Sequence, residues 1–317
     1  MFQRVKYSIK AVIKSILPPF IYNISLKGFN KFQNRLSILL NKGFPAPWSR
    51  GYVEYKMRMV SRSLSDDDLL GKFRNREMLP EGYGYGLDER IIEYPWLFAN
   101  LPKEACNILD AGSILNHKTI IEQSCWSNKK LHIATLAPEP VCFWQKGISY
   151  LYEDLRCLPM KDNFYDVIIC LSTIEHIGCD NTIHTKDGTH RETRLDDYLQ
   201  AIKELRRVLK PDGSLFLSVP FGKYEYLGMF QQFDLLLLNH AMSSFGPAIK
   251  VREDFFKYSK GGWQISKADE CSDCTFVKWI IEAWQKRSVP FVVPTEGDLA
   301  AAARAVACIH LVKKGAN

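Results

Sequence analysis

The sequence predicts an α/β fold with a doubly wound, seven-stranded, mostly parallel sheet and an antiparallel closing strand. The first observation is the apolar run 165–171 (YDVIICL), which has strand length, is bounded by turn residues and is typical of a strand covered on both faces. The second is an amphipathic helix pattern over 195–209, followed by a Pro-Asp-Gly that we expect to end the helix. The third is the series of further strand-like runs, at 106–113, 131–135, 148–152, 214–220, 249–266 and 306–312, with a helix expected over 276–284.

The positive charge of the chain is concentrated at its N-terminus. The 317 residues have a formal net charge of +7, and nine of the 42 Lys and Arg lie in residues 1–53, which hold no Asp or Glu. The remaining 33 basic residues face 35 acidic ones. The rest of the chain is therefore not a basic nucleic-acid reader, and no nucleic-acid partner is expected.

Residues 1–42 are predicted to form a basic amphipathic helical arm. Their apolar residues recur at helical spacing with lysines on the other side, and Pro18-Pro19 interrupts the pattern. Two interpretations remain open: peripheral contact with an anionic inner membrane or a glycan-assembly complex, and packing on the protein itself. The longest uncharged run, 15–26, contains the proline pair and is too short to span a bilayer.

Two further features bound the organisation of the chain. Residues 43–100 are rich in aromatics and glycine, and we expect a lid or edge segment before a domain over 101–317. The nine cysteines lie in apolar runs or singly in loops, which favours reduced thiols and a cytoplasmic location. The C-x-x-C at 271–274 has no second pair, so no metal site is expected.

The segment 153–178 (EDLRCLPMKDNFYDVIICLSTIEHIG) carries an ordered set of motifs. An acid, a Leu-Pro pair, D-x-F-x-D and Glu-His follow one another, and 202–222 (IKELRRVLKPDGSLFLSVPFG) continues as helix, turn and strand. In this order they resemble the middle motifs of class I S-adenosylmethionine-dependent methyltransferases, a Rossmann-like family. The matching residues are Asp154, Leu158-Pro159, Asp162, Phe164, Asp166 and Glu175-His176.

The resemblance implies S-adenosylmethionine as cofactor and places its binding residues after successive strands, where open α/β sheets bind ligands. The turn after the first strand would hold the methionine part, and Asp154 and Leu155 the adenine. Where the family usually has an acid for the ribose, this chain has Thr135, so that either Glu139 reaches back or ribose recognition is relaxed. The expected cofactor-binding residues are Asp110, Gly112, Ser113, Thr135, Asp154, Leu155, Ser172 and Thr173.

Methyl transfer is an in-line displacement, and a hydroxyl acceptor also needs a base to take its proton. The predicted catalytic residues are His176 and the neighbouring Glu175; a role of His176 in capping the next helix is the alternative. An aromatic, amide-rich insertion at about 223–248 is the expected acceptor-binding region. Its predicted substrate contacts are Tyr224, Tyr226, Gln231 and Gln232, although the aromatic residues also fit plain packing in a lid.

The whole chain is similar to uncharacterised bacterial methyltransferases associated with surface-polysaccharide biosynthesis, on the residues ILPPFIYN, PWSRGYVEY, EGYGYGLDER, LDAGSILNH and VPFGKY. That resemblance implies methyl transfer to a sugar hydroxyl or amine, on a nucleotide sugar or a lipid-linked glycan. Only Gly112 remains of the family's glycine loop. A non-catalytic, methyltransferase-like scaffold or regulatory subunit of a glycan-assembly complex is therefore the alternative.

Overall fold

The computed structural model describes residues 44–285 and 296–315. The predicted arm over 1–42 lies outside these residues. The chain divides into two units, Met1–Tyr55 and Lys56–Asn317, and helix α3 (Tyr52–Leu64) contains the boundary between them. The fold described below is that of the second unit.

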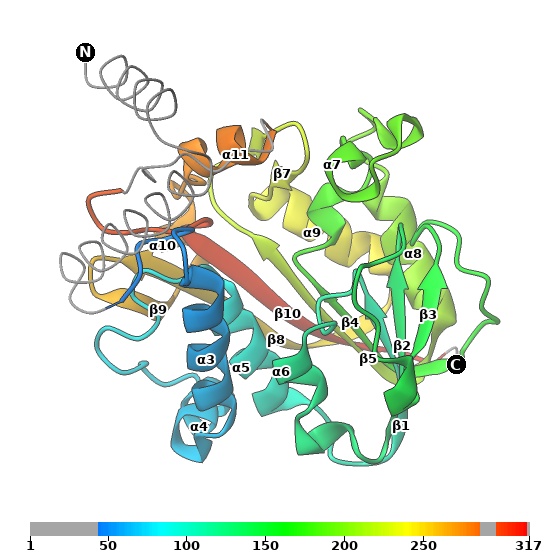
Figure 1. Cartoon of the computed structure of the whole chain (residues 1–317). Coiled ribbons are helices and arrows are strands. Elements are labelled where there is room, and N and C mark those ends of the chain that lie inside the picture. Colours follow the sequence, from blue (N-terminus) through cyan, green and yellow to red (C-terminus); the bar gives the residue numbers. More distant parts are fainter. Residues whose placement is uncertain (1–43, 286–295, 316–317) are drawn as a thin grey trace, which may run out of the picture. The chain divides into compact units, whose positions relative to one another are not determined.

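An eight-stranded sheet organises this unit (Figure 1), with the strand order β3-β2-β1-β4-β5-β10-β8-β9. The five strands β1 to β5 run parallel to one another, whereas β10 is antiparallel to both β5 and β8. The α/β fold with a mostly parallel sheet and an antiparallel closing strand is thereby confirmed. The strands are β1 (Cys106–Ala111), β2 (Lys129–Thr135), β3 (Ser149–Tyr152), β4 (Tyr165–Leu171), β5 (Leu209–Pro220), β8 (Ala248–Ser259), β9 (Gly262–Ser266) and β10 (Ala305–Lys313).

The sheet has one strand more than predicted. The run 249–266 is not one strand but a hairpin, in which β9 folds back against β8 with Ser259 opposite Gly262. Gly262 has a φ of +89°, and a Cβ there would lie 2.4 Å from the carbonyl oxygen of Tyr83. The glycine therefore permits both the turn and the close approach of the chain at residue 83.

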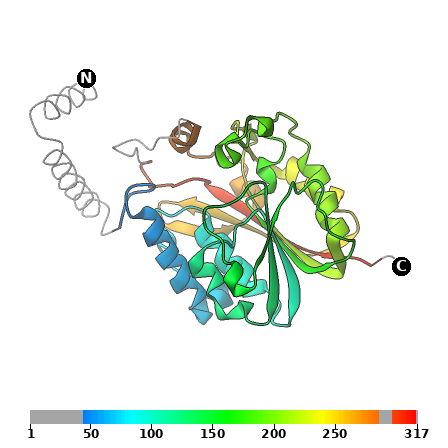
Figure 2. The same ribbon diagram turned by 45° about the vertical axis from the view of Figure 1, so that its right-hand side comes forward.

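Helices cover both faces of the sheet. Figure 2 shows α4 (Asp67–Asn75) and α5 (Arg90–Asn100) on one side, and α8 (Tyr198–Val208) and α9 (Leu235–Phe245) on the other. The alternation of side chains along β5 explains the two layers, because Phe216 packs edge-on against Trp96 of α5. The side chains next to Phe216 along β5 point to the other face and pack in the core under α8 and α9. This core contains Leu215, Leu217 and Val219 of β5, Ala201, Ile202 and Leu205 of α8, and Leu238 and Ala241 of α9.

The predicted helix stop at residues 211–213 is wrong in detail. Helix α8 ends at Val208, and Leu209 already pairs with Tyr165 of β4. The next registered pair is Val167 with Ser214, so the Pro-Asp-Gly lies in a bulge within β5, where Asp212 has a φ of +60°. The Pro-Asp-Gly therefore interrupts the pairing of β5 with β4 without ending the strand, since pairing resumes at Ser214.

Shorter elements complete the unit and form most of the connections. They are α6 (Lys118–Ile121), α7 (Thr182–Thr185), α10 (Ala268–Cys271), α11 (Lys278–Gln285), the two-stranded pair β6 (Glu225–Tyr226) and β7 (Gln231–Gln232), and 3₁₀ turns at Ser124–Trp126, Trp144–Lys146, Ile174–His176 and Gly188–His190. Among the helices of the described residues, none has the length and apolar character needed to cross a membrane.

Candidate functional site

A cavity of about 400 Å³ opens at the carboxyl ends of β1, β2, β3 and β4. Strand β1 lies between β2 and β4, so the chain leaves β1 in one direction along the sheet and later returns on its other side. Such a switch point leaves a crevice beyond the strand ends. The loops 112–114, 134–140, 153–156 and 172–178 line it, together with Arg90 of α5 and a segment that extends to Glu192.

Gly112 allows the loops after β1 and β4 to meet. It has a φ of +122°, and a Cβ on it would lie 2.1 Å from Oγ1 of Thr173. Thr173 is itself held, because its Oγ1 donates to the carbonyl oxygen of Leu171 at 2.9 Å. Any larger residue at 112 would push the two loops apart, so this glycine shapes the floor of the cavity.

Asp110 and Ser113 are buried and do not line the cavity, although Gly112 and Ile114 beside them do. The Asp110 carboxylate accepts hydrogen bonds from the backbone N–H groups of Ile114, at 3.1 Å, and Leu115, at 2.8 Å. Complete burial raises the pKa of Asp110 to about 7, although these two bonds act in the opposite direction. Ser113 has a φ of +64° and a buried Oγ without a hydrogen-bond partner in the described residues. The structure thus uses Asp110 to close the turn, and its predicted contact with a ligand stays a prediction.

Thr135 and Glu139 both line the cavity after β2. Asn116 Nδ2 donates to Glu139 Oε2 at 2.6 Å and to the carbonyl oxygen of Val141 at 2.9 Å, and its Oδ1 accepts from Tyr150 at 2.8 Å. These bonds hold the loop in place, and Glu139 lines the cavity. Its contact with a ribose stays a prediction. Within the described residues, Oε1 of Glu139 accepts no hydrogen bond.

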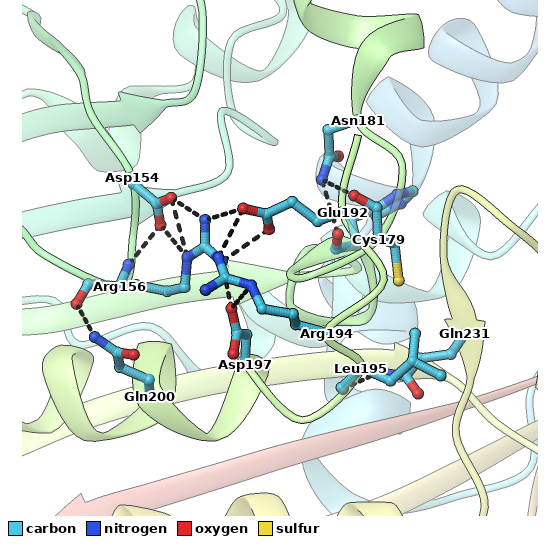
Figure 3. Close-up of polar contacts among 11 residues, drawn as sticks. Asp154, Arg156, Cys179, Asn181, Glu192, Arg194, Leu195, Asp197, Gln200 and Gln231 are labelled. Carbon is cyan, nitrogen blue, oxygen red and sulfur yellow. Dashed lines mark hydrogen bonds and ion pairs between the residues drawn. The ribbon is translucent and has the colours of Figure 1, made fainter. Parts of the chain in front are cut away.

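Asp154 and Leu155 reach the cavity from the end of β3, and Arg156 fixes the carboxylate (Figure 3). The backbone N–H of Arg156 donates to Asp154 Oδ1 at 2.8 Å, and its guanidinium binds Asp154, Glu192 and Asp197. Burial raises the pKa of Asp154, but the bonds from Arg156 outweigh it and hold that pKa below its usual value. One arginine therefore joins the strand end to the start of α8 and to residue 192.

The segment 177–192, here called the wall segment, forms the side of the cavity beyond β4. It contains α7, and an antiparallel bridge between Asp180 and Arg191 closes it into a loop. Glu192 ties its end to Arg156. The cavity-facing residues of this segment are Ile177, Gly178, Asn181, His184, Thr185, His190 and Glu192.

His176 lines the cavity, while the adjacent Glu175 is buried behind it. The Nδ1 of His176 donates to the carbonyl oxygen of Met229 at 2.8 Å, which leaves Nε2 as an acceptor. Burial lowers the pKa of His176 to about 3, and burial raises the pKa of Glu175 well above its usual value. The imidazole is therefore neutral near pH 7, and burial favours the protonated form of Glu175. A group with a pKa of about 3 is a weak base near neutral pH, so the predicted role of His176 as the catalytic base stays a prediction.

Arg90 is a cavity residue that the sequence analysis did not identify. Its guanidinium pairs with Glu93, whose Oε1 accepts hydrogen bonds from Oγ of Ser172 and of Ser218, each at 2.5 Å. Glu93 is fully buried, whereas the Arg90 side chain keeps 21% of its surface exposed. The available signal was a charged pair three residues apart in the otherwise apolar helix sequence RIIEYPWLFA.

The structure does not bring the predicted substrate contacts to the cavity. Gln231 donates to the carbonyl oxygen of Leu195 at 2.7 Å, and Gln232 donates to those of Lys223 and Cys274 at 2.7 and 2.8 Å. Both glutamines are buried, because these bonds tie down the β6–β7 pair. Tyr224 and Tyr226 belong to the same region and are 41% and 39% exposed, but neither lines the cavity.

No group of three or more His, Cys, Asp or Glu within residues 44–285 and 296–315 is arranged to hold a metal ion. The cysteines at 271 and 274 are free thiols buried in the fold. Burial raises the pKa of Cys271 to about 11, so this thiol is a poor metal ligand near neutral pH.

Comparison with known proteins gives one family match. Residues 127–217 match the family model described as "Methyltransferase domain". The matched stretch runs from just before β2 into β5 and includes Glu139, Asp154 and His176 of the cavity, but not Arg90 or Gly112. The likeness to a methyltransferase domain is thus found in the middle of the chain.

More distant likenesses cover other shares of the chain. An uncharacterized protein of Methanocaldococcus jannaschii is 32% identical over 62 residues, which is 20% of this chain and 19% of that protein. The 1,6-didemethyltoxoflavin-N1-methyltransferase of Burkholderia thailandensis, solved with S-adenosylhomocysteine, is 13% identical over 67% of this chain and 72% of that chain, with a TM-score of 0.39. The N-methyltransferase NodS of Bradyrhizobium japonicum, also solved with S-adenosylhomocysteine, is 10% identical over 82% and 99%, with a TM-score of 0.40. These values are too low for a role to be transferred from either structure.

Proposed function

We propose that this protein is a class I S-adenosylmethionine-dependent methyltransferase. The observation that carries the proposal is a single cavity at the carboxyl ends of four neighbouring parallel strands, within and beside the matched methyltransferase domain. Its volume of about 400 Å³ lies in the range of ligand pockets, which is roughly 300–1,000 Å³.

The residues around the cavity fit the chemistry of this cofactor. Adenine presents an amino edge that Asp154 can accept from, beside the apolar side chain of Leu155. The ribose presents two neighbouring hydroxyls, for which the free oxygen of Glu139 is a charged acceptor. Thr173 meets the Gly112 turn, and Ser172 lines the same cavity, on the side that the sequence resemblance assigns to the methionine part.

The cofactor supplies a methyl group on a sulfonium, and the protein's part is to align the acceptor and exclude water. His176 offers a neutral Nε2 that can accept a hydrogen bond from an incoming N–H or O–H. A neutral amine needs only this alignment, whereas a hydroxyl also requires a stronger base than His176 at a pKa of about 3. This chemistry favours an amine over a hydroxyl acceptor.

The acceptor that we propose is a small polar molecule, a sugar amine or hydroxyl in surface-glycan biosynthesis, and the low pKa of His176 favours the amine. Its support is the whole-chain sequence resemblance and the polar lining of the wall segment, with Asn181, His184 and Thr185 facing the cavity. A cytoplasmic location, and contact of residues 1–42 with an anionic membrane or a glycan-assembly complex, belong to the same proposal.

Native mass spectrometry of freshly purified full-length protein tests the cofactor assignment. We expect a bound mass equal to S-adenosylhomocysteine, or its appearance on adding the pure compound at micromolar concentration. Protein that takes up none at millimolar concentration would contradict the proposal. It would favour the alternative, a non-catalytic scaffold, which the reduction of the glycine loop to Gly112 also favours.

Glu139→Gln and Thr135→Val separate the two interpretations of ribose binding. Because a hydrogen bond to a charged group contributes about 1.5–3 kcal/mol, the first change should weaken S-adenosylhomocysteine binding by roughly 10- to 100-fold. The second should change it by less than about threefold, since a single neutral hydroxyl contributes little. The reverse order of effects, measured by calorimetry, would assign the ribose to Thr135.

A further inference from the structure

Two cavity-lining residues of the described chain carry a permanent positive charge, Arg90 and Arg156. The guanidinium of Arg156 is shared among Asp154, Glu192 and Asp197. Arg90 makes one ion pair, from Nη1 to Glu93, and within residues 44–285 and 296–315 its other side-chain N–H groups donate no hydrogen bond. Of these two arginines, Arg90 is thus the one whose guanidinium keeps N–H donors that a ligand could bind.

The position of Arg90 is fixed from behind the cavity. Glu93 receives Ser172 and Ser218 on Oε1 and holds Arg90 on Oε2, so one buried carboxylate joins α5 to the ends of β4 and β5. Ser172 lines the cavity and has a φ of +38°, a conformation that costs free energy and that this bond helps to maintain. Arg90 and Ser172 are therefore oriented together.

Helix α5 contacts the loops after both β1 and β4, because Tyr94 Oη donates to the carbonyl oxygen of Ile114 at 2.6 Å and Glu93 accepts from Ser172. Arg90 lies one turn earlier on the same helix. Its charge acts on Asp110, at the end of β1, and on Glu175, directly after β4. Burial raises the pKa of both carboxyl groups, to about 7 for Asp110, which weakens their negative charge, while Glu93 is the anion paired with the guanidinium. The cavity consequently presents, from the side of α5, a guanidinium that is paired through Nη1 and keeps N–H donors on its other nitrogens.

We propose that Arg90 binds the carboxylate of the methyl donor's amino-acid part, and that Glu93 is the positioning residue that orients Arg90 toward it. The inference rests on the proposed function, because it assigns one end of the same ligand. A guanidinium fork matches a carboxylate in shape and charge, which a lysine ammonium does not.

Decarboxylated S-adenosylmethionine is the probe that isolates this contact, since it keeps the sulfonium, amine, ribose and adenine and lacks only the carboxylate. Calorimetry on the full chain should show that the wild type binds S-adenosylmethionine about 10- to 100-fold more tightly than the decarboxylated form. Arg90→Gln should reduce this preference to less than about threefold. Arg90→Lys should keep part of it, because the charge remains without the fork.

A variant that leaves Glu93 buried and unpaired can fail to fold, so the double variant Arg90→Met/Glu93→Gln is measured as well. It removes both charges of the pair and should also lose the preference. Arg206→Gln is the matched control, because Arg206 lies outside the cavity lining and donates to the carbonyl oxygen of Pro247. It should retain the wild-type preference.

The outcomes separate the inference from the proposed function. A wild type that binds both compounds equally tightly overturns the role of Arg90 and leaves the methyl-donor assignment intact. A preference that survives in the folded double variant also overturns it, because the carboxylate would then be held elsewhere. A wild type that binds neither compound overturns the function and the inference together.

Discussion

The two arginines of the cavity occupy similar settings and have opposite availability. Arg156 keeps 15% of its side-chain surface exposed and contacts three carboxylates, whereas Arg90 keeps 21% exposed and contacts one. Exposure and charge therefore do not distinguish them. The two arginines differ in how many N–H donors remain free of internal partners. Arg156, here called the clamp, holds three carboxylates together, whereas Arg90 keeps donors for a ligand.

The partners of these arginines differ more than the arginines themselves. Glu93 is fully buried, whereas Asp154, Glu192 and Asp197 keep 34%, 19% and 22% of their side chains exposed. A buried carboxylate depends wholly on its partner, because water cannot replace a lost ion pair there. Carboxylates at a cavity rim recover hydration when the pair is broken.

The largest expected effect comes from removing Glu93, the buried partner of Arg90. Glu93→Ala should lower the free energy of unfolding by about 3–5 kcal/mol, since it strands Arg90 and two serine hydroxyls. Glu192→Ala, the matched change at the other arginine, should lower it by about 1 kcal/mol or less. Urea titration measures both, and equal losses would contradict the contrast between the two pairs.

A smaller effect is expected from removing the clamp. Arg156→Gln leaves three carboxylates near one another without their shared cation and should cost about 1–2 kcal/mol of stability. Because Glu192 is then released, amide hydrogen exchange in the wall segment should quicken while that in β4 stays unchanged. Arg194→Gln is the control, since Arg194 is 63% exposed and also touches Glu192. Unchanged exchange in Arg156→Gln would show that the wall segment does not depend on the clamp.

The pH response of His176 is a finer test. Its pKa of about 3 lies below the value of about 6.5 for an unperturbed histidine, so the unfolded chain takes up this proton first as the pH falls. His176 therefore makes the fold less stable as pH decreases through 6.5 toward 3. Nitrogen NMR of ¹⁵N-histidine-labelled protein should show a neutral ring with Nδ1 protonated from pH 8 to 5. A titration near 6.5 would contradict this.

The smallest effect separates the two arginines again. The Arg90 charge is one of the causes that lower the pKa of His176, after burial and His184, whereas Arg156 is not among them. Arg90→Gln should therefore raise that pKa slightly, and Arg156→Gln should leave it unchanged. The same NMR titration, extended to the lowest pH at which the protein stays folded, measures both shifts. Equal pKa shifts in the two variants would contradict the conclusion that Arg90, and not Arg156, acts on His176.

Local patterns predicted the sheet well and the long-range contacts poorly. The bounds 165–171 of β4 are predicted and observed alike, because a continuous apolar run between turn residues leaves little choice. The loops that line the cavity follow from strand order. Arg156 was not identified, although it is two residues from Asp154, because its other partners lie 36 and 41 residues away in sequence.

The directions in which side chains point could not be predicted from the sequence. Tyr224, Tyr226, Gln231 and Gln232 suit a polar ring ligand, yet whether they face the cavity depends on how the β6–β7 pair is anchored. The side-chain amide of Gln232 donates hydrogen bonds to two backbone carbonyl oxygens, and no pattern in the sequence indicates these contacts. Arg90 shows the converse, because packing of α5 on the sheet brings to the cavity a residue that precedes β1.

The central claim is that the cavity beyond β1 to β4 holds the methyl donor, and Gly112→Ala tests it most directly. A Cβ at 112 would lie 2.1 Å from Thr173 Oγ1, whereas Gly71 of α4 has nothing within 4 Å and provides the control Gly71→Ala. Calorimetry with S-adenosylhomocysteine should show one site in the wild type and in Gly71→Ala. In Gly112→Ala the affinity should fall by about 100-fold or more, since a backbone shift there displaces both loops. Undiminished binding by folded Gly112→Ala would place the ligand elsewhere and contradict the account.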